Sequence, residues 1–162
     1  MKKVTAILIG AGLRGGYVYS QYALDHPDEF QVVAVAEPDP ERRELFAAKH
    51  QIPSELCFES YEELLKKEKM ADCAMGCTQD KMHYEPVVMA MEKGYHVLCE
   101  KPMSPDKKEI IKMEEMAKKY NRILSVCHVL RYSPFFSKLK ELLEEGRNGR
   151  QMTIQHIEEV GY

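Results

Sequence analysis

Short apolar runs alternate with longer amphipathic segments along most of the chain. The apolar runs are nearly continuous, which is typical of parallel strands that helices cover on both faces. Strands are predicted at residues 4–9, 31–36, 56–58, 72–77, 95–99 and 123–127. The pattern therefore predicts an α/β fold built on a parallel sheet.

The amphipathic segments predict a helix after each of these strands. Their ranges are 14–25, 40–50, 61–69, 82–93, 105–120 and 134–145. Pro40 suits the first position of a helix, where a missing N–H costs little, and Gly94 suits the left-handed position that follows a helix. The alternation predicts a doubly wound sheet in a three-layer αβα arrangement.

The end of the sequence departs from this alternation. After a turn at residues 146–149, residues 151–160 have the pattern of one more strand, and a single strand cannot form a sheet. We therefore expect residues 1–127 to form one domain and residues 128–162 to be the crossover helix and first strand of a truncated second α/β domain. Because an exposed strand invites pairing with another chain, a homodimer through residues 151–160 is a further hypothesis.

The composition fits a globular protein, with 162 residues, 44% hydrophobic residues, 30% charged residues and a net charge of −3. A negative charge without a basic stripe argues against nucleic-acid binding. The longest uncharged apolar stretch, residues 4–13, is too short to span a membrane and lacks the organisation of a signal peptide. The sequence predicts a cytoplasmic protein without membrane or nucleic-acid partners.

The five cysteines form neither an even set nor a C-x-x-C pair, so reduced thiols are expected. Cys73, Cys99 and Cys127 lie in apolar runs, where a thiol packs as a small hydrophobic group, and no metal site is expected. Cys77 follows Gly76 at a predicted strand end and either packs in the core or lines a pocket.

Residues 10–15, with the sequence Gly-Ala-Gly-Leu-Arg-Gly, connect the first predicted strand to the first predicted helix. In a G-x-G-x-x-G turn the first glycine permits the tight turn, the second lets the backbone approach a pyrophosphate, and the third packs the helix on the strand. The helix N-terminus attracts the anion, although a glycine-rich turn without a ligand is the alternative. The turn predicts a Rossmann fold with cofactor contacts from Gly10, Gly12, Leu13, Arg14 and Gly15.

An acidic residue follows at the end of the second predicted strand. Glu37 lies 22 residues after Gly15, a spacing that suits a carboxylate bonded to the adenine-ribose hydroxyls. It would repel a 2′-phosphate, so NAD is favoured over NADP. Arg42 is close enough in sequence to reach the adenosine end, which keeps NADP open, whereas Arg43 is expected to be a solvated helix residue.

Two further motifs follow the fourth and fifth predicted strands. Residues 76–83 are Gly-Cys-Thr-Gln-Asp-Lys-Met-His, and residues 99–102 are Cys-Glu-Lys-Pro. Ligands bind at the carboxyl ends of strands in open α/β sheets. With these motifs in this order, the chain closely resembles the glucose-fructose oxidoreductase/inositol dehydrogenase family, Gfo/Idh/MocA, over roughly residues 3–162. The resemblance implies an NAD(P)-dependent oxidoreductase that transfers hydride between nicotinamide and a sugar, polyol or related hydroxyl substrate.

The resemblance also implies roles for individual residues. Lys101 corresponds to the catalytic lysine, beside the nicotinamide and the substrate hydroxyl, and Glu100 lies near the same end of the cofactor. Thr78 and Gln79 correspond to the loop along the nicotinamide ribose and pyrophosphate, although the family often has Pro or Asn in place of Gln79. His83 matches a histidine at the next helix start, where a structural hydrogen bond is an equal alternative.

Arg131, in the crossover toward the second domain, is expected to face cofactor and substrate, with a hinge role as the alternative. The family's substrate-binding groups come from a C-terminal domain, so we expect this chain alone to bind cofactor without efficient turnover. Three other readings stay open: a non-catalytic nucleotide-binding module, an NAD-dependent glycosidase relative, and an S-adenosylmethionine methyltransferase. The last does not explain the Glu-Lys-Pro motif.

Overall fold

The computed structural model describes residues 2–147, 149, 150, 153, 155 and 157. The chain divides into two compact units, Met1–Cys127 and His128–Tyr162. The strand predicted at residues 151–160, and the homodimer expected through it, fall largely outside the described residues.

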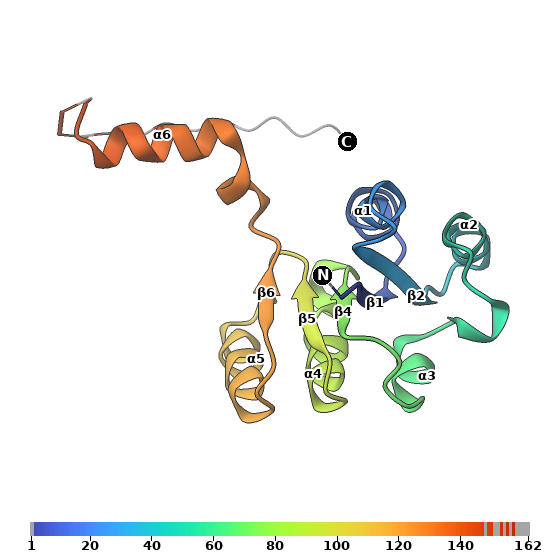
Figure 1. Cartoon of the computed structure of the whole chain (residues 1–162). Helices are drawn as coiled ribbons and strands as arrows, with labels where there is room; N and C mark the ends of the chain where they lie inside the picture. Colours follow the sequence, from blue (N-terminus) through green and yellow to red (C-terminus); the bar gives the residue numbers. More distant parts are fainter. Residues whose placement is uncertain (1, 148, 151–152, 154, 156, 158–162) are drawn as a thin grey trace. The chain divides into compact units, whose positions relative to one another are not determined.

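The first unit contains a six-stranded parallel sheet (Figure 1). Its strands are β1 (Val4–Ile9), β2 (Phe30–Ala36), β3 (Cys57–Phe58), β4 (Cys73–Gly76), β5 (His96–Cys99) and β6 (Leu124–Val126). The strand order is β3-β2-β1-β4-β5-β6, so the direction of winding reverses between β1 and β4, which lie side by side. This is the order of the dinucleotide-binding Rossmann fold, and it confirms the predicted fold class.

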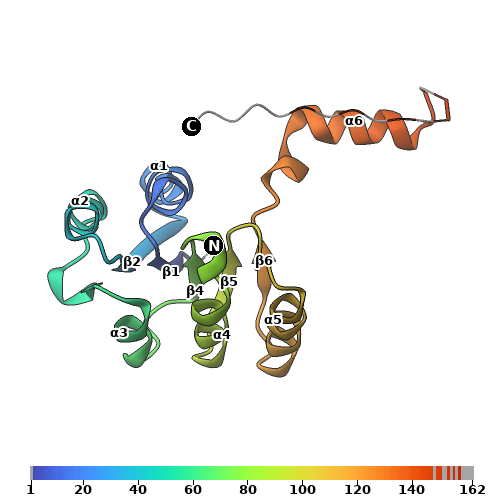
Figure 2. The ribbon, with the colours of Figure 1, turned by 180° about the vertical axis from the view of Figure 1, so that it is seen from behind.

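Helices cover both faces of the sheet (Figure 1, Figure 2). The helical elements of the first unit are η1 (Leu13–Tyr19), α1 (Gln21–Asp25), α2 (Pro40–His50), η2 (Ser54–Leu56), α3 (Tyr61–Lys66), η3 (Asp80–Met82), α4 (Tyr84–Glu92) and α5 (Lys107–Lys119). Helices α1 and α2 lie on one face, and α3, α4 and α5 on the other (Figure 1). The predicted three-layer arrangement is therefore present.

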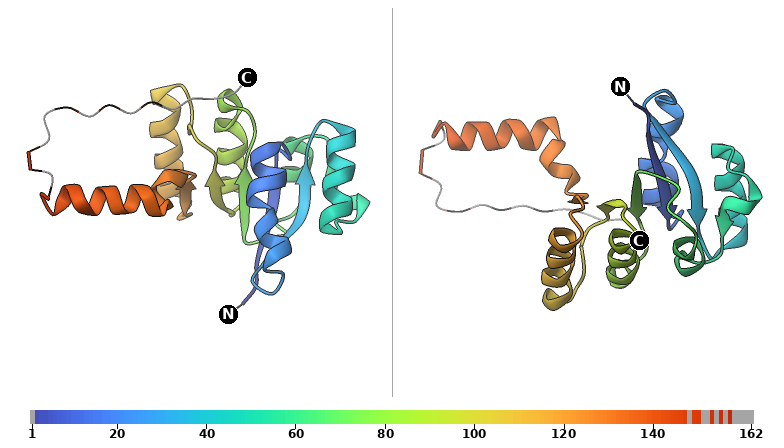
Figure 3. Two further views of the ribbon diagram at one scale, coloured as in Figure 1. Left: turned by 90° about the horizontal axis from the view of Figure 1, so that it is seen from above. Right: turned by 60° about the horizontal axis from the view of Figure 1, so that its bottom comes forward.

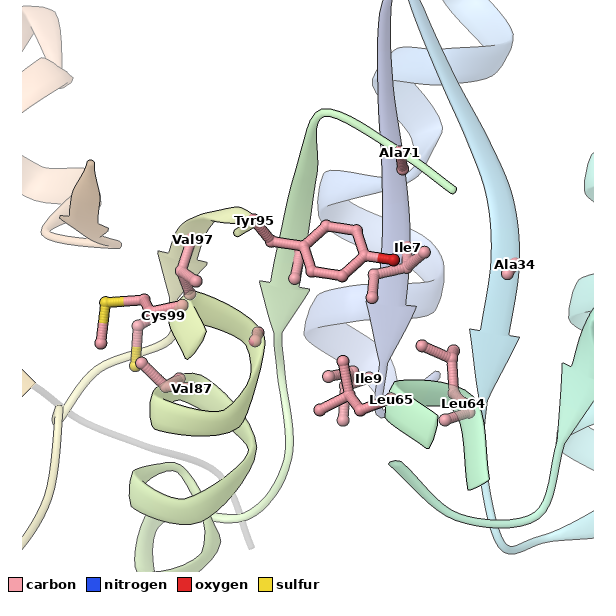
Figure 4. Packing of buried hydrophobic residues seen from close by; sticks show 14 of the residues in the cluster. Ile7, Ile9, Ala34, Leu64, Leu65, Ala71, Val87, Tyr95, Val97 and Cys99 are labelled. Atoms are coloured by element: carbon pink, nitrogen blue, oxygen red, sulfur yellow. The ribbon is translucent and has the colours of Figure 1, made fainter. Parts of the chain in front are cut away.

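Strand β1 contributes to a hydrophobic core on each face because its side chains alternate. Ile7 and Ile9 pack with residues of α3, α4 and α5, whereas Ala6 and Leu8 pack with residues of α1 and α2. The four side chains are at most 2% exposed. Figure 4 shows the ring of Tyr95 reaching across the first core toward Ile7. β1, which also pairs with β2 (Figure 3), is thus the central element of the unit.

The first helix differs from the continuous α-helix predicted at residues 14–25. Its first part, η1, is a π-helix, and α1 follows after Ser20. The backbone N–H and the side-chain hydroxyl of the fully buried Ser20 both donate to the carbonyl of Gly15, at 3.2 and 2.6 Å. A serine hydroxyl can compete in this way for helix carbonyls, and such π segments recur at functional sites.

The second unit contains the short helix η4 (Val129–Tyr132) and the helix α6 (Pro134–Glu144). Pro134 occupies the first turn of α6, where its missing N–H leaves no hydrogen bond unmade. No described residue of α6 is buried. The amphipathic helix predicted at residues 134–145 is therefore present, with its apolar side chains at least partly exposed.

His50, the last residue of α2, generates a test of how the fold responds to pH. Its ring is 9% exposed and stacks on Phe46, with ring centres 4.2 Å apart. Its Nε2 atom has no hydrogen-bond partner in the described part of the chain. Burial lowers the pKa of His50 from 6.5 to about 4, and the Lys49 ammonium adds to this effect.

The folded protein thus keeps His50 neutral in a range where the unfolded chain takes up a proton. Stability from this group is lost as pH falls from 6.5 toward 4. We predict that His50→Leu gains stability relative to the wild type between about pH 7.5 and about pH 5, measured by urea unfolding at each pH. A difference between variant and wild type that is the same at both pH values would contradict this.

Candidate cofactor site at the carboxyl end of the sheet

The glycine turn after β1 is closely packed at its ends and open in its middle. Gly10 has a φ of +91°, and a Cβ there would lie 2.6 Å from the carbonyl oxygen of Cys77. A Cβ on Gly15 would lie 2.3 Å from the carbonyl oxygen of Gly10. A Cβ on Gly12 meets no atom within 4 Å. The protein itself therefore excludes a side chain at Gly10 and Gly15, whereas Gly12 faces free space.

Gly16 is a third constrained glycine of this turn, which the sequence interpretation missed. A Cβ on Gly16 would lie 2.6 Å from the carbonyl oxygen of Ala11. The adjacent pair Gly15 and Gly16 was the available signal, since a six-residue motif accounts for only the first of them. Together they let the first turn of η1 lie against the loop that precedes it.

The start of η1 presents free backbone donors. Gly12 is its N-cap, and within the described residues no side chain caps the first N–H groups of the helix. Leu13 is 72% exposed, and Arg14 is exposed beside it. The helix dipole adds a positive partial charge at this point, so the turn offers an anion both hydrogen-bond donors and an attractive potential.

Glu37 lies at the end of β2 with 3% of its surface exposed. One carboxylate oxygen accepts from the backbone N–H of Ala11 at 2.7 Å. The other accepts from the N–H of Asp39 at 3.1 Å and from Nη1 of Arg42 at 3.3 Å. Since a carboxylate offers about four acceptor positions, these three bonds leave room for one more donor. Glu37 thus ties the glycine turn to β2.

Arg42 and Arg43 follow Glu37 but differ in their surroundings. The Arg42 side chain is 46% exposed, and besides Glu37 it faces Asp39 at 3.8 Å. Arg43 is not the solvated residue that the sequence led us to expect. Its side chain is 14% exposed, and its Nη1 donates to the carbonyl of Glu37 at 2.6 Å. Arg43 is half-buried because it satisfies a carbonyl in the bend between β2 and α2.

His83 connects the loops that follow β4 and β5. Its ring is 1% exposed, with Nδ1 at 2.7 Å from the carbonyl oxygen of Pro102 and Nε2 at 2.9 Å from that of Thr78. A neutral imidazole has one N–H, so only a ring that carries both protons donates to both carbonyls. Neither nitrogen is left for a cofactor. His83 instead has the structural hydrogen bonds that were considered as its alternative.

The segment after β5 combines a buried carboxylate with an exposed lysine. Glu100 is 5% exposed, and one of its oxygens accepts from the Lys101 backbone N–H at 2.7 Å. Its other oxygen accepts from the hydroxyl of Tyr19, on η1. The Lys101 side chain is exposed at the carboxyl edge of the sheet. Tyr19 was missed because no local pattern joins residues 81 positions apart.

The contacts described above bring most of the predicted residues to one edge of the first unit. Thr78 is half-buried and Gln79 is exposed in the loop after β4, and the Thr78 hydroxyl donates to the carbonyl of Met82 at 3.1 Å. Arg131 lies in the second unit, on η4, where its carbonyl accepts from Ser137 at 3.2 Å.

The thiols give no sign of metal or disulfide chemistry. All five cysteines are free, and no cluster of potential metal ligands occurs in the described part of the chain. Burial raises the pKa of Cys77, Cys99 and Cys127, which favours the neutral thiol. Cys77 is 8% exposed and packs in the hydrophobic core that contains Leu8. Among the described residues, no helix is both long and apolar enough to cross a membrane.

Comparison with known proteins identifies the family. The oxidoreductase family with an NAD-binding Rossmann fold, Gfo/Idh/MocA, matches residues 4–128. The chain belongs to this family. The resemblance inferred from the glycine turn and the Glu-Lys-Pro motif is thereby confirmed, and the Gfo/Idh/MocA assignment makes the first unit an NAD-binding domain.

Several Gfo/Idh/MocA relatives are similar to the chain. Trans-1,2-dihydrobenzene-1,2-diol dehydrogenase of Mus musculus is 37% identical over 121 residues, which is 75% of this chain and 35% of that protein. An oxidoreductase structure from Thermotoga maritima has a TM-score of 0.81 at 28% identity, covering 91% of this chain and 44% of that one. The WlbA dehydrogenase of Bordetella pertussis, solved with NADH and UDP-GlcNAcA, has a TM-score of 0.82 at 23% identity, covering 92% and 42%.

The chain spans about a third of the length of the first curated relatives that it matches, 35% in each of the first five. The shared part corresponds to the NAD-binding fold of Gfo/Idh/MocA proteins.

The contrast between Gly15 and Gly12 generates a paired prediction. We expect Gly15→Ala to lower the free energy of unfolding by about 1–3 kcal/mol, because the added methyl group overlaps backbone and strains the turn. Gly12→Ala should change it by less than about 0.5 kcal/mol, because nothing occupies that space, yet weaken NAD binding. Urea unfolding and NAD titration of both variants test this, and equal stability losses would refute it.

Proposed function

We propose that this chain supplies the NAD-binding half of an oxidoreductase that transfers hydride between nicotinamide and a sugar, polyol or related hydroxyl compound. The observation that carries the proposal is the open space at Gly12, between two glycines packed against backbone and beside the buried carboxylate of Glu37. A backbone turn of this kind fits a pyrophosphate. Glu37 on one side of it fits the adenosine end of the cofactor, and the residues around Lys101 on the other side fit the nicotinamide end.

At the adenosine end, Glu37 would bind the ribose hydroxyls. The Arg42 contact is the longest of its three hydrogen bonds and comes from a half-exposed side chain. A ribose hydroxyl can therefore replace or join Arg42 while the backbone donors hold the carboxylate in place. The negative charge of Glu37 repels a 2′-phosphate, which favours NAD. The cation of Arg42 could pair with a 2′-phosphate and so allow NADP to bind.

At the pyrophosphate, Gly10, Gly12 and Gly15 would shape the turn, and the N–H groups of Leu13 and Arg14 would donate to the phosphate oxygens. At the nicotinamide end, Thr78 and Gln79 would line the ribose. His83 would act indirectly, by fixing the carbonyls of Thr78 and Pro102.

We assign the catalytic role to Lys101. NAD, when bound, would accept or release the hydride, and the exposed Nζ of Lys101 would exchange the proton of the substrate hydroxyl. Glu100 would lie beside the nicotinamide end of the site. Arg131 would face cofactor and substrate from the second unit, which we propose to be the start of a substrate domain that follows the boundary at residue 127.

The substrate class rests on the relatives. One is named as a diol dehydrogenase, and fold neighbours are named as dehydrogenases of inositol or were solved with a sugar nucleotide. A carbon that bears a hydroxyl group is common to them. The free state of all five cysteines supports a reducing compartment such as the cytoplasm. We expect residues 1–162 alone to bind cofactor with little turnover.

A thermal-unfolding titration tests the proposal. At a concentration of about 100 times Kd, NAD should raise the free energy of unfolding by about 2.7 kcal/mol, because it binds only the folded state. NADP should shift the transition less, and S-adenosylmethionine should not shift it. Stabilisation by S-adenosylmethionine alone would indicate a methyltransferase instead, and no shift with NAD would refute the cofactor site.

The role of Glu37 generates a specificity prediction. Glu37→Gln keeps an oxygen for the Ala11 N–H but removes the charge, so the ratio of Kd for NADP to Kd for NAD should fall roughly tenfold. Both constants can be measured by calorimetry. Glu41→Gln, an exposed carboxylate in the first turn of α2, is the matched control and should leave the ratio unchanged. An unchanged ratio in Glu37→Gln would show that Glu37 does not face the ribose.

A further inference from the structure

A single hydrogen bond joins the glycine-turn helix to the segment that carries the lysine. Tyr19 is the last residue of η1, and its hydroxyl donates to the buried carboxylate of Glu100. The helix η1 thus begins next to the open Gly12, and its last residue is hydrogen-bonded to Glu100, which directly precedes Lys101. No other hydrogen bond from an η1 side chain to the β5 segment is found in the described part of the chain.

Glu100 is fixed from three directions. Its backbone N–H donates to the carbonyl of Gly76 at 2.8 Å, which extends the β4–β5 pairing by one residue. Tyr19 holds one carboxylate oxygen, and the Lys101 N–H holds the other. A carboxylate bonded in this way has a defined rotamer. Because the Lys101 N–H donates to it, the carboxylate also fixes the backbone of Lys101, the second residue after β5.

Tyr19 suits the role of a donor here. Burial, and then the hydrogen bond to Glu100, raise the pKa of Tyr19 above its ordinary value, so the phenol keeps its proton. The neighbouring thiol of Cys127, the residue after β6, raises the pKa of Tyr19 in the same direction. A phenylalanine would fill the same space but would leave an oxygen of Glu100 buried without its donor, and that loss is costly in a buried site.

We propose that Tyr19 is a positioning residue, which holds the Glu100 carboxylate and thereby sets the place of Lys101 relative to the helix that receives the pyrophosphate. The inference rests on the proposed function for its meaning in catalysis, but its structural part can be tested without cofactor. The hydrogen bond of Tyr19 is to Glu100 and not to the Lys101 side chain in the described part of the chain. Its effect passes through the carboxylate of Glu100.

The first test measures the Lys101 backbone amide by NMR hydrogen exchange in the full chain without ligand. Tyr19→Phe should speed exchange of this amide roughly tenfold relative to the amide of Leu8, a fully buried residue of β1, since the acceptor of the Lys101 N–H is no longer fixed. Referring the rate to Leu8 removes any general loss of stability. Tyr17→Phe, an exposed tyrosine on the same helix, is the matched control and should have no effect.

A double-mutant comparison separates the route through Glu100 from a general packing effect. Glu100→Gln alone should speed Lys101 exchange, and adding Tyr19→Phe should give little further increase. Additive increases, or an unchanged Lys101 amide in Tyr19→Phe, would overturn the proposal. An equal rise in the exchange rates of the Lys101 and Leu8 amides would overturn it as well, because Tyr19 would then act on global stability.

The second test separates the two ends of the cofactor. Tyr19→Phe should weaken NAD binding roughly tenfold while leaving ADP-ribose, which lacks nicotinamide, within about twofold of wild type. Equal weakening of both ligands would contradict a role at the Lys101 end. If wild-type chain binds neither ligand, the proposed function fails, whereas the amide-exchange result still decides whether Tyr19 positions Lys101.

Discussion

The contact of backbone on backbone at Gly10 and Gly15 is the constraint on which the rest of the site depends. Neither residue has a Cβ, so η1 lies close to the end of β1 and to Cys77, the residue after β4. A methyl group at either glycine would prevent this separation. This approach brings the start of the helix to the carboxyl edge of the sheet. It also brings the end of the helix within reach of Glu100, so one packing requirement fixes both ends of the site.

Two buried carboxylates, Glu37 and Glu100, flank that helix. An uncompensated buried carboxylate is costly, and here each is bonded to a backbone N–H, of Ala11 and of Lys101. The same bonds that compensate the charges also fix the loops that carry them. The contacts that compensate the two charges are therefore the same contacts that shape the proposed cofactor site.

The sequence predicted all six strands because each is a continuous apolar run, and it predicted the glycine turn and Glu37 because their spacing is a local property. It could not predict features that depend on tertiary neighbours. The π-helix η1 ends beside Ser20, whose bonds to the Gly15 carbonyl exist only once the helix is formed. Arg43 resembles any charged helix residue in the sequence, and its bond to the Glu37 carbonyl forms only in the folded bend between β2 and α2. The Tyr19 contact lies beyond any pattern in the sequence.

The hydrogen bonds around Lys101 show how the first unit holds the backbone of the proposed catalytic lysine. Its backbone is held on one side by Glu100, and His83 binds the carbonyl of the residue that follows it. All of these residues belong to the unit Met1–Cys127. The Lys101 side chain is exposed. A substrate domain would then select which hydroxyl group reaches Lys101, without having to create the position of the lysine.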